Sequence, residues 1–210
     1  MTKIAIFDMD GTLIDTKKDI TISINYVRRT NHKLEPLSED YVVNVINMPV
    51  RNLPQLFYGT NTYQDGDKIL FEEHYFGQCI QHPYLYDGIE VLLTELASLH
   101  VKLNVATNAP TKFAQRMLSH LGISHLFDTV IGADKAASKP DAKMLDIILN
   151  RYKFSYANDN AWMIGDNSKD IQAAKAKNIS SIFATWGFSK DGNADFVASH
   201  PLEILDIILK

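Results

Sequence analysis

The sequence predicts an α/β protein in which a mostly parallel sheet is flanked by helices and a small α-helical domain is inserted after the first strand. The first observation is the short apolar run at residues 4–7, which is typical of a buried strand and stops at polar residues. The second is the alternation of strand-like and helical patterns from Tyr84 onward, which indicates crossover units and parallel pairing. The third is that no strand pattern interrupts residues 16–83. We therefore expect a core domain of residues 1–15 and 84–210 and a helical cap domain of residues 16–83.

The inserted stretch contains four helical patterns. Apolar residues recur at helical spacing over residues 20–27. Ser38 is expected to cap a second helix, which Pro49 should end. A third, short helix is expected over residues 53–58, and Asp67 is expected to cap a longer fourth helix. This region therefore predicts a helical domain without strands of its own.

The remainder of the chain predicts alternating helices and strands. Strands are expected at residues 101–106, 129–131, 161–164 and 181–184, with a short edge strand at 196–197. Helices are expected at residues 89–99, 110–122, 141–152, 168–178 and 201–209.

The composition excludes several classes of function. The net charge of the 210 residues is -4, so no basic field favours nucleic acid or an anionic membrane surface as a partner. No apolar run reaches the roughly 20 residues that cross a bilayer. A single cysteine, Cys79, rules out an internal disulfide framework. We expect a cytoplasmic protein without a signal peptide that is a monomer or a weak dimer.

Polar residues follow four of the predicted strands where each one ends. Because the carboxyl ends of parallel strands meet at one edge of a sheet, these side chains should converge there. The functional prediction depends on this convergence, because each motif alone can also be explained by an ordinary structural role. The residues are Asp8 and Asp10, then Thr107 and Asn108, then Lys139, and finally Asp166 and Asp170.

Such a cluster is suited to phosphoryl transfer, which depends on positioning and on neutralising charge. Asp8 would be the nucleophile. Its negative charge opposes approach to a phosphate dianion, so a cation must intervene. Asp8 and Asp166, with the main-chain carbonyl of Asp10, would supply hard oxygen ligands for Mg²⁺. Asp170 would orient the metal ligands and also buffer Lys139.

The remaining residues would handle protons and phosphoryl oxygens. Asp10 would protonate the leaving oxygen and then activate the hydrolytic water. The Thr107 hydroxyl and the Lys139 ammonium would hold the phosphoryl oxygens, and Asn108 would also contact the substrate. Asp134 is a lower-ranked alternative metal ligand.

Some of these residues also have a purely structural interpretation. Asp166 and Asp170 could serve as a helix cap and a first-turn charge. Trp186 and Phe188 either line the pocket or pack in the core. The seven histidines show no spacing typical of zinc ligands.

Four motifs together resemble those of the haloacid dehalogenase-type phosphohydrolases, nearest the phosphoglycolate phosphatase-like branch with a helical cap. They are Asp8-Met9-Asp10-Gly11-Thr12-Leu13-Ile14-Asp15, Val105-Ala106-Thr107-Asn108, Ser138-Lys139-Pro140 and Gly165-Asp166-Asn167-Ser168-Lys169-Asp170. The resemblance implies a Rossmann-like core, a cap inserted after the first motif, Mg²⁺ and an aspartyl-phosphate mechanism. The carboxylate of Asp10 distinguishes phosphatases from the dehalogenating members of the family, because a halide needs no proton to leave.

The sequence thus predicts a Mg²⁺-dependent phosphatase that acts on a small phosphomonoester such as 2-phosphoglycolate or a sugar phosphate. In the cap, Arg51 is a candidate for binding a distal anionic group of the substrate. One alternative is a phosphomutase of the β-phosphoglucomutase kind, which would hydrolyse its phosphoenzyme slowly. Another is a non-catalytic, phosphate-binding protein on the same fold.

Overall fold

The computed structural model describes residues 1–48, 50–190 and 192–210, and Pro49, expected to end a helix, lies outside them. Contacts divide the chain into two compact units. The core unit comprises Met1–Asp15 and Leu85–Lys210, and the helical unit comprises Thr16–Tyr84.

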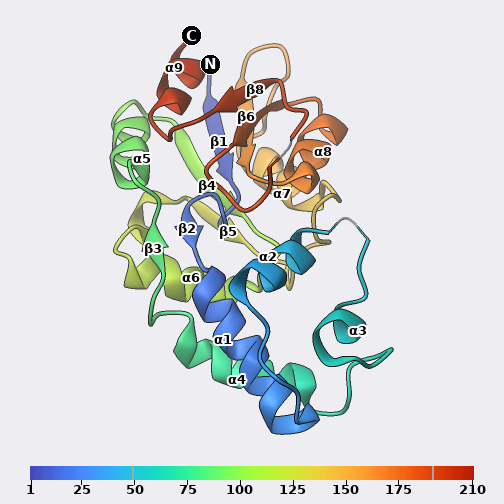
Figure 1. The fold of residues 1–210 in the computed structure, drawn as a ribbon. Coiled ribbons are helices and arrows are strands. Elements are labelled where there is room, and N and C mark those ends of the chain that lie inside the picture. The colour runs from blue at the N-terminus through green and yellow to red at the C-terminus, as the bar shows by residue number, and fades with distance from the viewer. Residues whose placement is uncertain (49, 191) are drawn as a thin grey trace. The chain divides into compact units, whose positions relative to one another are not determined.

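The core unit contains a six-stranded sheet with the order β5-β4-β1-β6-β7-β8 (Figure 1). Neighbouring strands pair in parallel throughout, which confirms the predicted α/β class. The strands are β1 (Lys3–Phe7), β4 (Lys102–Ala106), β5 (Thr129–Ile131), β6 (Asn160–Gly165), β7 (Ser180–Ala184) and β8 (Phe196–Ala198). Central β1 is fully buried from Ile4 to Phe7, as expected for a parallel strand covered on both faces.

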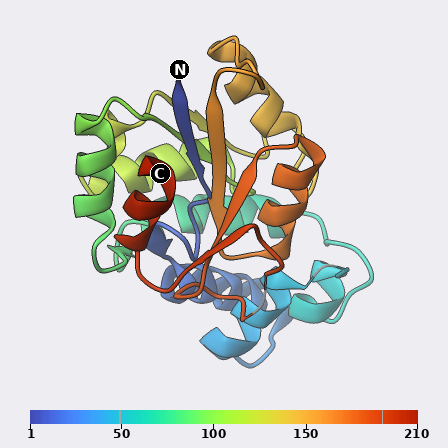
Figure 2. The same ribbon diagram turned by 90° about the horizontal axis from the view of Figure 1, so that it is seen from above.

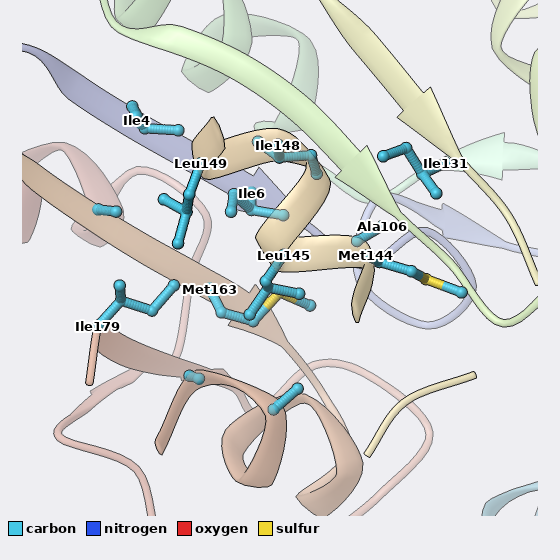
Figure 3. Packing of buried hydrophobic residues seen from close by; sticks show 13 residues of the cluster. Ile4, Ile6, Ala106, Ile131, Met144, Leu145, Ile148, Leu149, Met163 and Ile179 are labelled. Carbon is cyan, nitrogen blue, oxygen red and sulfur yellow. The ribbon is translucent and has the colours of Figure 1, made fainter. Parts of the chain in front are cut away.

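Helices cover both faces of this sheet. They are α5 (Ile89–Ser98), α6 (Thr111–His120), α7 (Lys143–Arg151), α8 (Ser168–Ala176) and α9 (Glu203–Leu209), with a short 3₁₀ helix at Ser124–Leu126. Figure 2 shows α5 and α9 on one side of the sheet and α7 and α8 on the other. On the α7 side, Ile4 and Ile6 of β1 and Met163 of β6 pack against Leu145 and Ile148 of α7 (Figure 3). This burial anchors the strands whose ends carry the polar motifs.

The helical unit has its own apolar core. Its elements are α1 (Lys17–Val27), a π-helical turn at Arg28–His32, α2 (Glu39–Asn47), α3 (Leu53–Tyr58) and α4 (Asp67–Gln78). Ile24, Val27, Val42, Val45, Phe57 and Tyr58 form the buried cluster. As predicted, the Ser38 hydroxyl accepts a hydrogen bond from the Tyr41 amide at the start of α2. Gly59 ends α3 in a left-handed conformation.

Two local predictions differ from the structure. Asp67 is the first residue of α4, and Gly66 takes the cap position with φ of 92°. The buried Asp67 carboxylate instead accepts hydrogen bonds from the Gln64 amide at 2.8 Å and the Asn31 side chain at 2.9 Å. The sequence also missed a two-stranded pair, β2 (Ile14–Asp15) with β3 (Tyr84–Leu85), because two residues carry no detectable period. Among the described residues, no helix is long and apolar enough to cross a membrane.

Candidate active site

The register of the central strands brings the polar motifs to one edge of the sheet. Phe7, the last residue of β1, pairs with Val105 of β4 and Ile164 of β6. The Asp8 amide continues the ladder by donating to the Ile164 carbonyl at 2.8 Å. The motif residues that follow these three strands therefore start at nearly the same height along the strand direction, offset by no more than one or two residues. This is the convergence that the parallel topology predicts.

Three carboxylates form the centre of this edge. Asp8, Asp166 and Asp170 each offer one oxygen atom, and these atoms all lie within 4.8 Å of one another. Asp166 and Asp170 are each only 1% exposed. The Asp8 side chain is 13% exposed, so it is the member of this cluster that solvent reaches most.

Lys139 supplies the balancing positive charge. Its Nζ atom lies 2.8 Å from Asp8 Oδ1 and 2.6 Å from Asp170 Oδ1, and the side chain is buried. Burial by itself lowers the pKa of the Lys139 ammonium, but the carboxylates of Asp170 and Asp8 outweigh it and raise the pKa above its ordinary value. Lys139 is therefore held in its charged form.

Asp166 is a buried carboxylate that lies close to two other carboxylates. Its Oδ2 accepts a hydrogen bond from the Phe188 amide at 2.6 Å, and its Oδ1 accepts one from the Thr12 hydroxyl at 3.2 Å. Burial, followed by repulsion from Asp8 and Asp170, nevertheless raises the pKa of Asp166 to about 8. Burial likewise raises the pKa of Asp170 to about 6, against the lowering effect of Lys139. One ammonium does not neutralise three carboxylates in this buried position.

Asp170 joins the site to the start of α8. Its Oδ2 accepts a hydrogen bond from the Asn167 amide at 3.1 Å, which completes a capping box with the Asn167 side chain. Its Oδ1 binds Lys139. The N-cap of α8 is thus Asn167 and not Asp166, whereas Asp170 is the first-turn carboxylate that the sequence offered and also contacts Lys139.

Two glycines leave the space that the carboxylates occupy. A Cβ atom at Gly165 would overlap the Asp170 side chain. A Cβ atom at Gly11 would lie 2.5 Å from Asp166 Oδ2, and the φ of Gly11 is +85°. A larger residue at either position would displace a carboxylate of the cluster.

Asp10 and Thr107 lie beside each other at the same edge. The Thr107 hydroxyl is 3.5 Å from Asp10 Oδ2, at the long limit of a hydrogen bond, and it accepts a hydrogen bond from the Ala109 amide at 3.1 Å. Thr107 is 1% exposed, which fixes the position of its hydroxyl. Asp10 stands outside the group of three carboxylates described above.

Two other candidates have different surroundings. Asp134 accepts hydrogen bonds from the Thr111 amide and hydroxyl, each at 2.6 Å, so it binds the first turn of α6 instead of joining the carboxylate cluster. Arg51 belongs to the helical unit, where its guanidinium donates to the Met48 carbonyl at 2.8 Å. The substrate contact expected of Arg51 stays a prediction.

The carboxylate cluster fits a divalent, oxygen-preferring cation. Octahedral Mg²⁺ holds its ligands at about 2.1 Å, so opposite ligand atoms lie about 4.2 Å apart. The 4.8 Å limit within the cluster is close to that span. With all three carboxylates ionised, one ammonium leaves two negative charges, and burial, followed by repulsion from Asp8 and Asp170, opposes this state by raising the pKa of Asp166. The donor set and its charge therefore suit Mg²⁺.

Sequence comparison assigns the family. The chain matches the family model of the haloacid dehalogenase-like hydrolases over residues 5–184. The chain belongs to this family. A phosphoglycolate phosphatase of Vibrio cholerae is 28% identical over 221 residues, which cover 99% of this chain and 97% of that protein. An N-acetylmuramic acid 6-phosphate phosphatase of Pseudomonas putida is 27% identical over 213 residues, which cover 97% of this chain and 94% of that protein.

Structural comparison agrees on the fold of this haloacid dehalogenase-like hydrolase. The crystal structure of a predicted phosphoglycolate phosphatase from Haemophilus somnus has a TM-score of 0.84 at 24% identity, covering 98% of this chain and 97% of that one. The resemblance that the four motifs carried, to the family and to its phosphoglycolate phosphatase-like branch, is confirmed.

Several contacts of the site were missed by the sequence analysis. The Thr12 hydroxyl and the Phe188 amide both bind Asp166, and the Trp186 indole donates to the Thr12 carbonyl at 3.0 Å. Thr12 lies within the first motif and was identifiable from it. A main-chain amide has no signature in the sequence, so the contribution of Phe188 was not predictable.

Proposed function

We propose that the protein is a Mg²⁺-dependent phosphatase that hydrolyses a small phosphomonoester through an aspartyl-phosphate on Asp8. The observation that carries this proposal is the arrangement around Asp8. Its carboxylate is the most exposed of the three, it lies 2.8 Å from the Lys139 ammonium, and the buried Asp166 stands beside it. A phosphate can thus reach one anionic oxygen among groups that offset the charge of both partners.

The metal would be held by Asp8, Asp166 and the main-chain carbonyl of Asp10, with Asp170 orienting these ligands through Lys139 and the start of α8. A Mg²⁺ ion bound there would shield the repulsion between Asp8 and the phosphate and would offset charge on the phosphoryl oxygens. Both roles follow from the two excess negative charges of the cluster.

In the first step, an oxygen of Asp8 attacks phosphorus as the bond from phosphorus to the ester oxygen breaks. Asp10 donates its proton to that leaving oxygen, which departs as an alcohol. The resulting Asp10 carboxylate then removes a proton from water, which attacks the phosphorus and releases Asp8 and inorganic phosphate. Thr107 and Lys139 hold the phosphoryl oxygens, on which charge is spread in both transition states.

The helical unit would serve as a cap that excludes water and selects the substrate. The chain enters it at Thr16, directly after the first motif, and leaves it at Tyr84, and the strands on either side of it, β2 and β3, pair with each other. Arg51 is the cap residue that we propose for a distal anionic group. The curated relatives are named for phosphoglycolate and for an amino-sugar 6-phosphate, so we propose a small acidic or sugar phosphomonoester as the substrate class.

The proposal is tested by measuring phosphate release from a panel of esters by the full chain. The panel contains 2-phosphoglycolate, N-acetylmuramic acid 6-phosphate, hexose phosphates and p-nitrophenyl phosphate, each assayed with Mg²⁺ and with EDTA. Asp8→Asn is the matched control, because it removes the nucleophile and keeps the size of the side chain. We expect release that requires both Mg²⁺ and Asp8. Equal release in EDTA, or equal release by the variant, would contradict the mechanism.

The same panel separates the alternatives. The relatives named above carry phosphatase names, so the comparisons do not favour a mutase. Conversion of β-glucose 1-phosphate to glucose 6-phosphate faster than phosphate release would nevertheless identify one. Binding of phosphate and Mg²⁺ without turnover of any ester would identify a non-catalytic protein.

A further inference from the structure

Both ends of the Asn108 side-chain amide are bound to the main chain of Lys139. Asn108 Nδ2 donates to the Lys139 carbonyl at 3.0 Å, and Asn108 Oδ1 accepts from the Lys139 amide at 2.8 Å. An asparagine can satisfy one residue's donor and acceptor together in this way because its amide carries both groups. The side chain that the sequence analysis assigned to the substrate is therefore engaged within the protein.

Lys139 depends on such support because its own segment lacks regular structure. Residues 132–142, between β5 and α7, contain neither helix nor strand. Asn108, in contrast, lies two residues after β4, which pairs with both β1 and β5. The two hydrogen bonds thus tie the main chain of Lys139 to the sheet that carries Asp8.

The position of the Lys139 main chain determines where its ammonium lies. Nζ contacts Asp8 Oδ1 at 2.8 Å, at the end of β1, and Asp170 Oδ1 at 2.6 Å, in the first turn of α8. The side chain is 2% exposed, so it has no free volume in which to compensate for a displaced backbone. A shift at the main chain would therefore move the ammonium away from one carboxylate or both.

We propose that Asn108 is a positioning residue that sets the location of the Lys139 ammonium for phosphoryl transfer and does not bind the substrate. The proposal rests on the proposed function, in which Lys139 holds phosphoryl oxygens. It predicts that the effect of losing Asn108 acts through Lys139. It also predicts that this effect is independent of the alcohol that leaves.

The structure offers a matched control on the same pair of loops. Asp134, in the Lys139 segment, accepts hydrogen bonds from the amide and hydroxyl of Thr111, which follows Asn108 by three residues. Asp134→Ala therefore removes a double contact between these loops, as Asn108→Ala does, but without touching Lys139. A loss due merely to looser loops would appear in both variants.

The experiment is a double-mutant cycle of Asn108→Ala and Lys139→Ala in the full chain, with Asp134→Ala as control. We expect Asn108→Ala to lower kcat/KM about 100-fold, the scale of a misplaced catalytic group, by a similar factor for p-nitrophenyl phosphate and for alkyl phosphates. We expect Asp134→Ala to change kcat/KM much less. In the Lys139→Ala background, Asn108→Ala should have little further effect. Equal factors in both backgrounds, or a factor that depends on the leaving alcohol, would overturn the proposal.

Two further measurements cover slow or unstable variants. Orthovanadate binding with Mg²⁺, followed by calorimetry, yields the same cycle when Lys139→Ala turns over too slowly, and Asn108→Ser replaces Asn108→Ala if the latter does not fold. Amide hydrogen exchange over residues 132–142 should accelerate in the Asn108 variant, because the Lys139 amide loses its acceptor. Unchanged hydrogen exchange over this segment would overturn the positioning role of Asn108, whether or not the wild-type chain hydrolyses any ester. Absence of ester hydrolysis by the wild-type chain would instead count against the proposed function.

Discussion

Replacing Asp166 by Asn should stabilise the metal-free protein while removing its function. The carboxylate is buried beside Asp8 and Asp170, and its pKa is raised to about 8. In the unfolded chain an aspartate has a pKa of about 3.9. At pH 7 the folded state must therefore keep protonated a group whose pKa in the unfolded chain lies about three units below that pH. At about 1.4 kcal/mol per unit, the wild type loses up to about 4 kcal/mol of its free energy of unfolding.

An asparagine would avoid this loss and keep the local contacts. Its amide oxygen can accept from the Phe188 amide as Asp166 Oδ2 does, and its NH₂ group can donate to the Thr12 hydroxyl. For a chain of this length, the gain corresponds to a rise in Tm of up to about 10 °C. Because the folded pKa is above the unfolded one, wild-type stability falls as the pH rises from about 4 to about 8. The advantage of Asp166→Asn should therefore be small near pH 4, grow through neutral pH and level off above pH 8.

The assay is thermal unfolding of both proteins in EDTA across this pH range, followed by circular dichroism. Addition of Mg²⁺ should then raise the Tm of the wild type, because a ligand that binds the folded state stabilises it, and should leave Asp166→Asn nearly unchanged. A variant that is less stable than the wild type in EDTA at every pH would refute the reasoning. The hydrogen bonds that the Asp166 carboxylate accepts would then stabilise the fold by more than the repulsion among the three carboxylates destabilises it.

Three further substitutions test the roles of residues within the site, and a fourth, in α4, serves as a control. Asp8→Asn should lower turnover by at least about 1,000-fold, as expected for loss of a nucleophile, without lowering the Tm in EDTA; measurable turnover within tenfold of the wild type would exclude Asp8 as nucleophile. Asp10→Asn should lower kcat by about 100- to 10,000-fold and retain Mg²⁺ binding by calorimetry, because the main-chain carbonyl is kept, whereas loss of the metal would assign the Asp10 carboxylate a ligand role instead. Gly165→Ala should destabilise the fold by about 1–3 kcal/mol, because its methyl group would overlap the Asp170 side chain. Gly77→Ala in α4, where nothing lies within 4 Å of the added carbon, should by contrast stabilise by up to about 1 kcal/mol, and equal melting of the two variants would contradict the overlap.

The elements that sequence patterns predicted are those that form a continuous apolar run, those whose burial is periodic, or those whose ends carry a recognisable residue. Ile4–Phe7, buried on both faces, and Ser38, a helix cap, are such cases. The β2–β3 pair was missed because its strands are too short to show a period. The cap of α4 was misassigned to Asp67 because an acidic residue is common at that position, whereas here the carboxylate faces Asn31 and the Gln64 amide.

The site was predictable as a set of residue types but not as a set of contacts. Parallel topology requires that residues following Phe7, Ala106 and Gly165 meet, and this follows from pattern alone. Which partner each group takes depends on the loops between strands and helices, whose conformation no periodicity encodes. Asn108 illustrates this, since its position after β4 is equally compatible with a bond to substrate or to the Lys139 main chain.

The excess negative charge of the site links its stability to its chemistry. A single ammonium among three carboxylates, two of them buried, leaves a centre that is unfavourable in the absence of a cation. Complete neutralisation by a second lysine would remove that penalty, but it would also remove the reason for a divalent ion to bind. The pKa of Asp166 is raised by burial first and then by repulsion from Asp8 and Asp170, and a divalent cation bound at the same place would relieve that repulsion. A substitution that relieves the imbalance should consequently stabilise the fold and weaken metal binding together, and any variant that does one without the other would show that the two have separate origins.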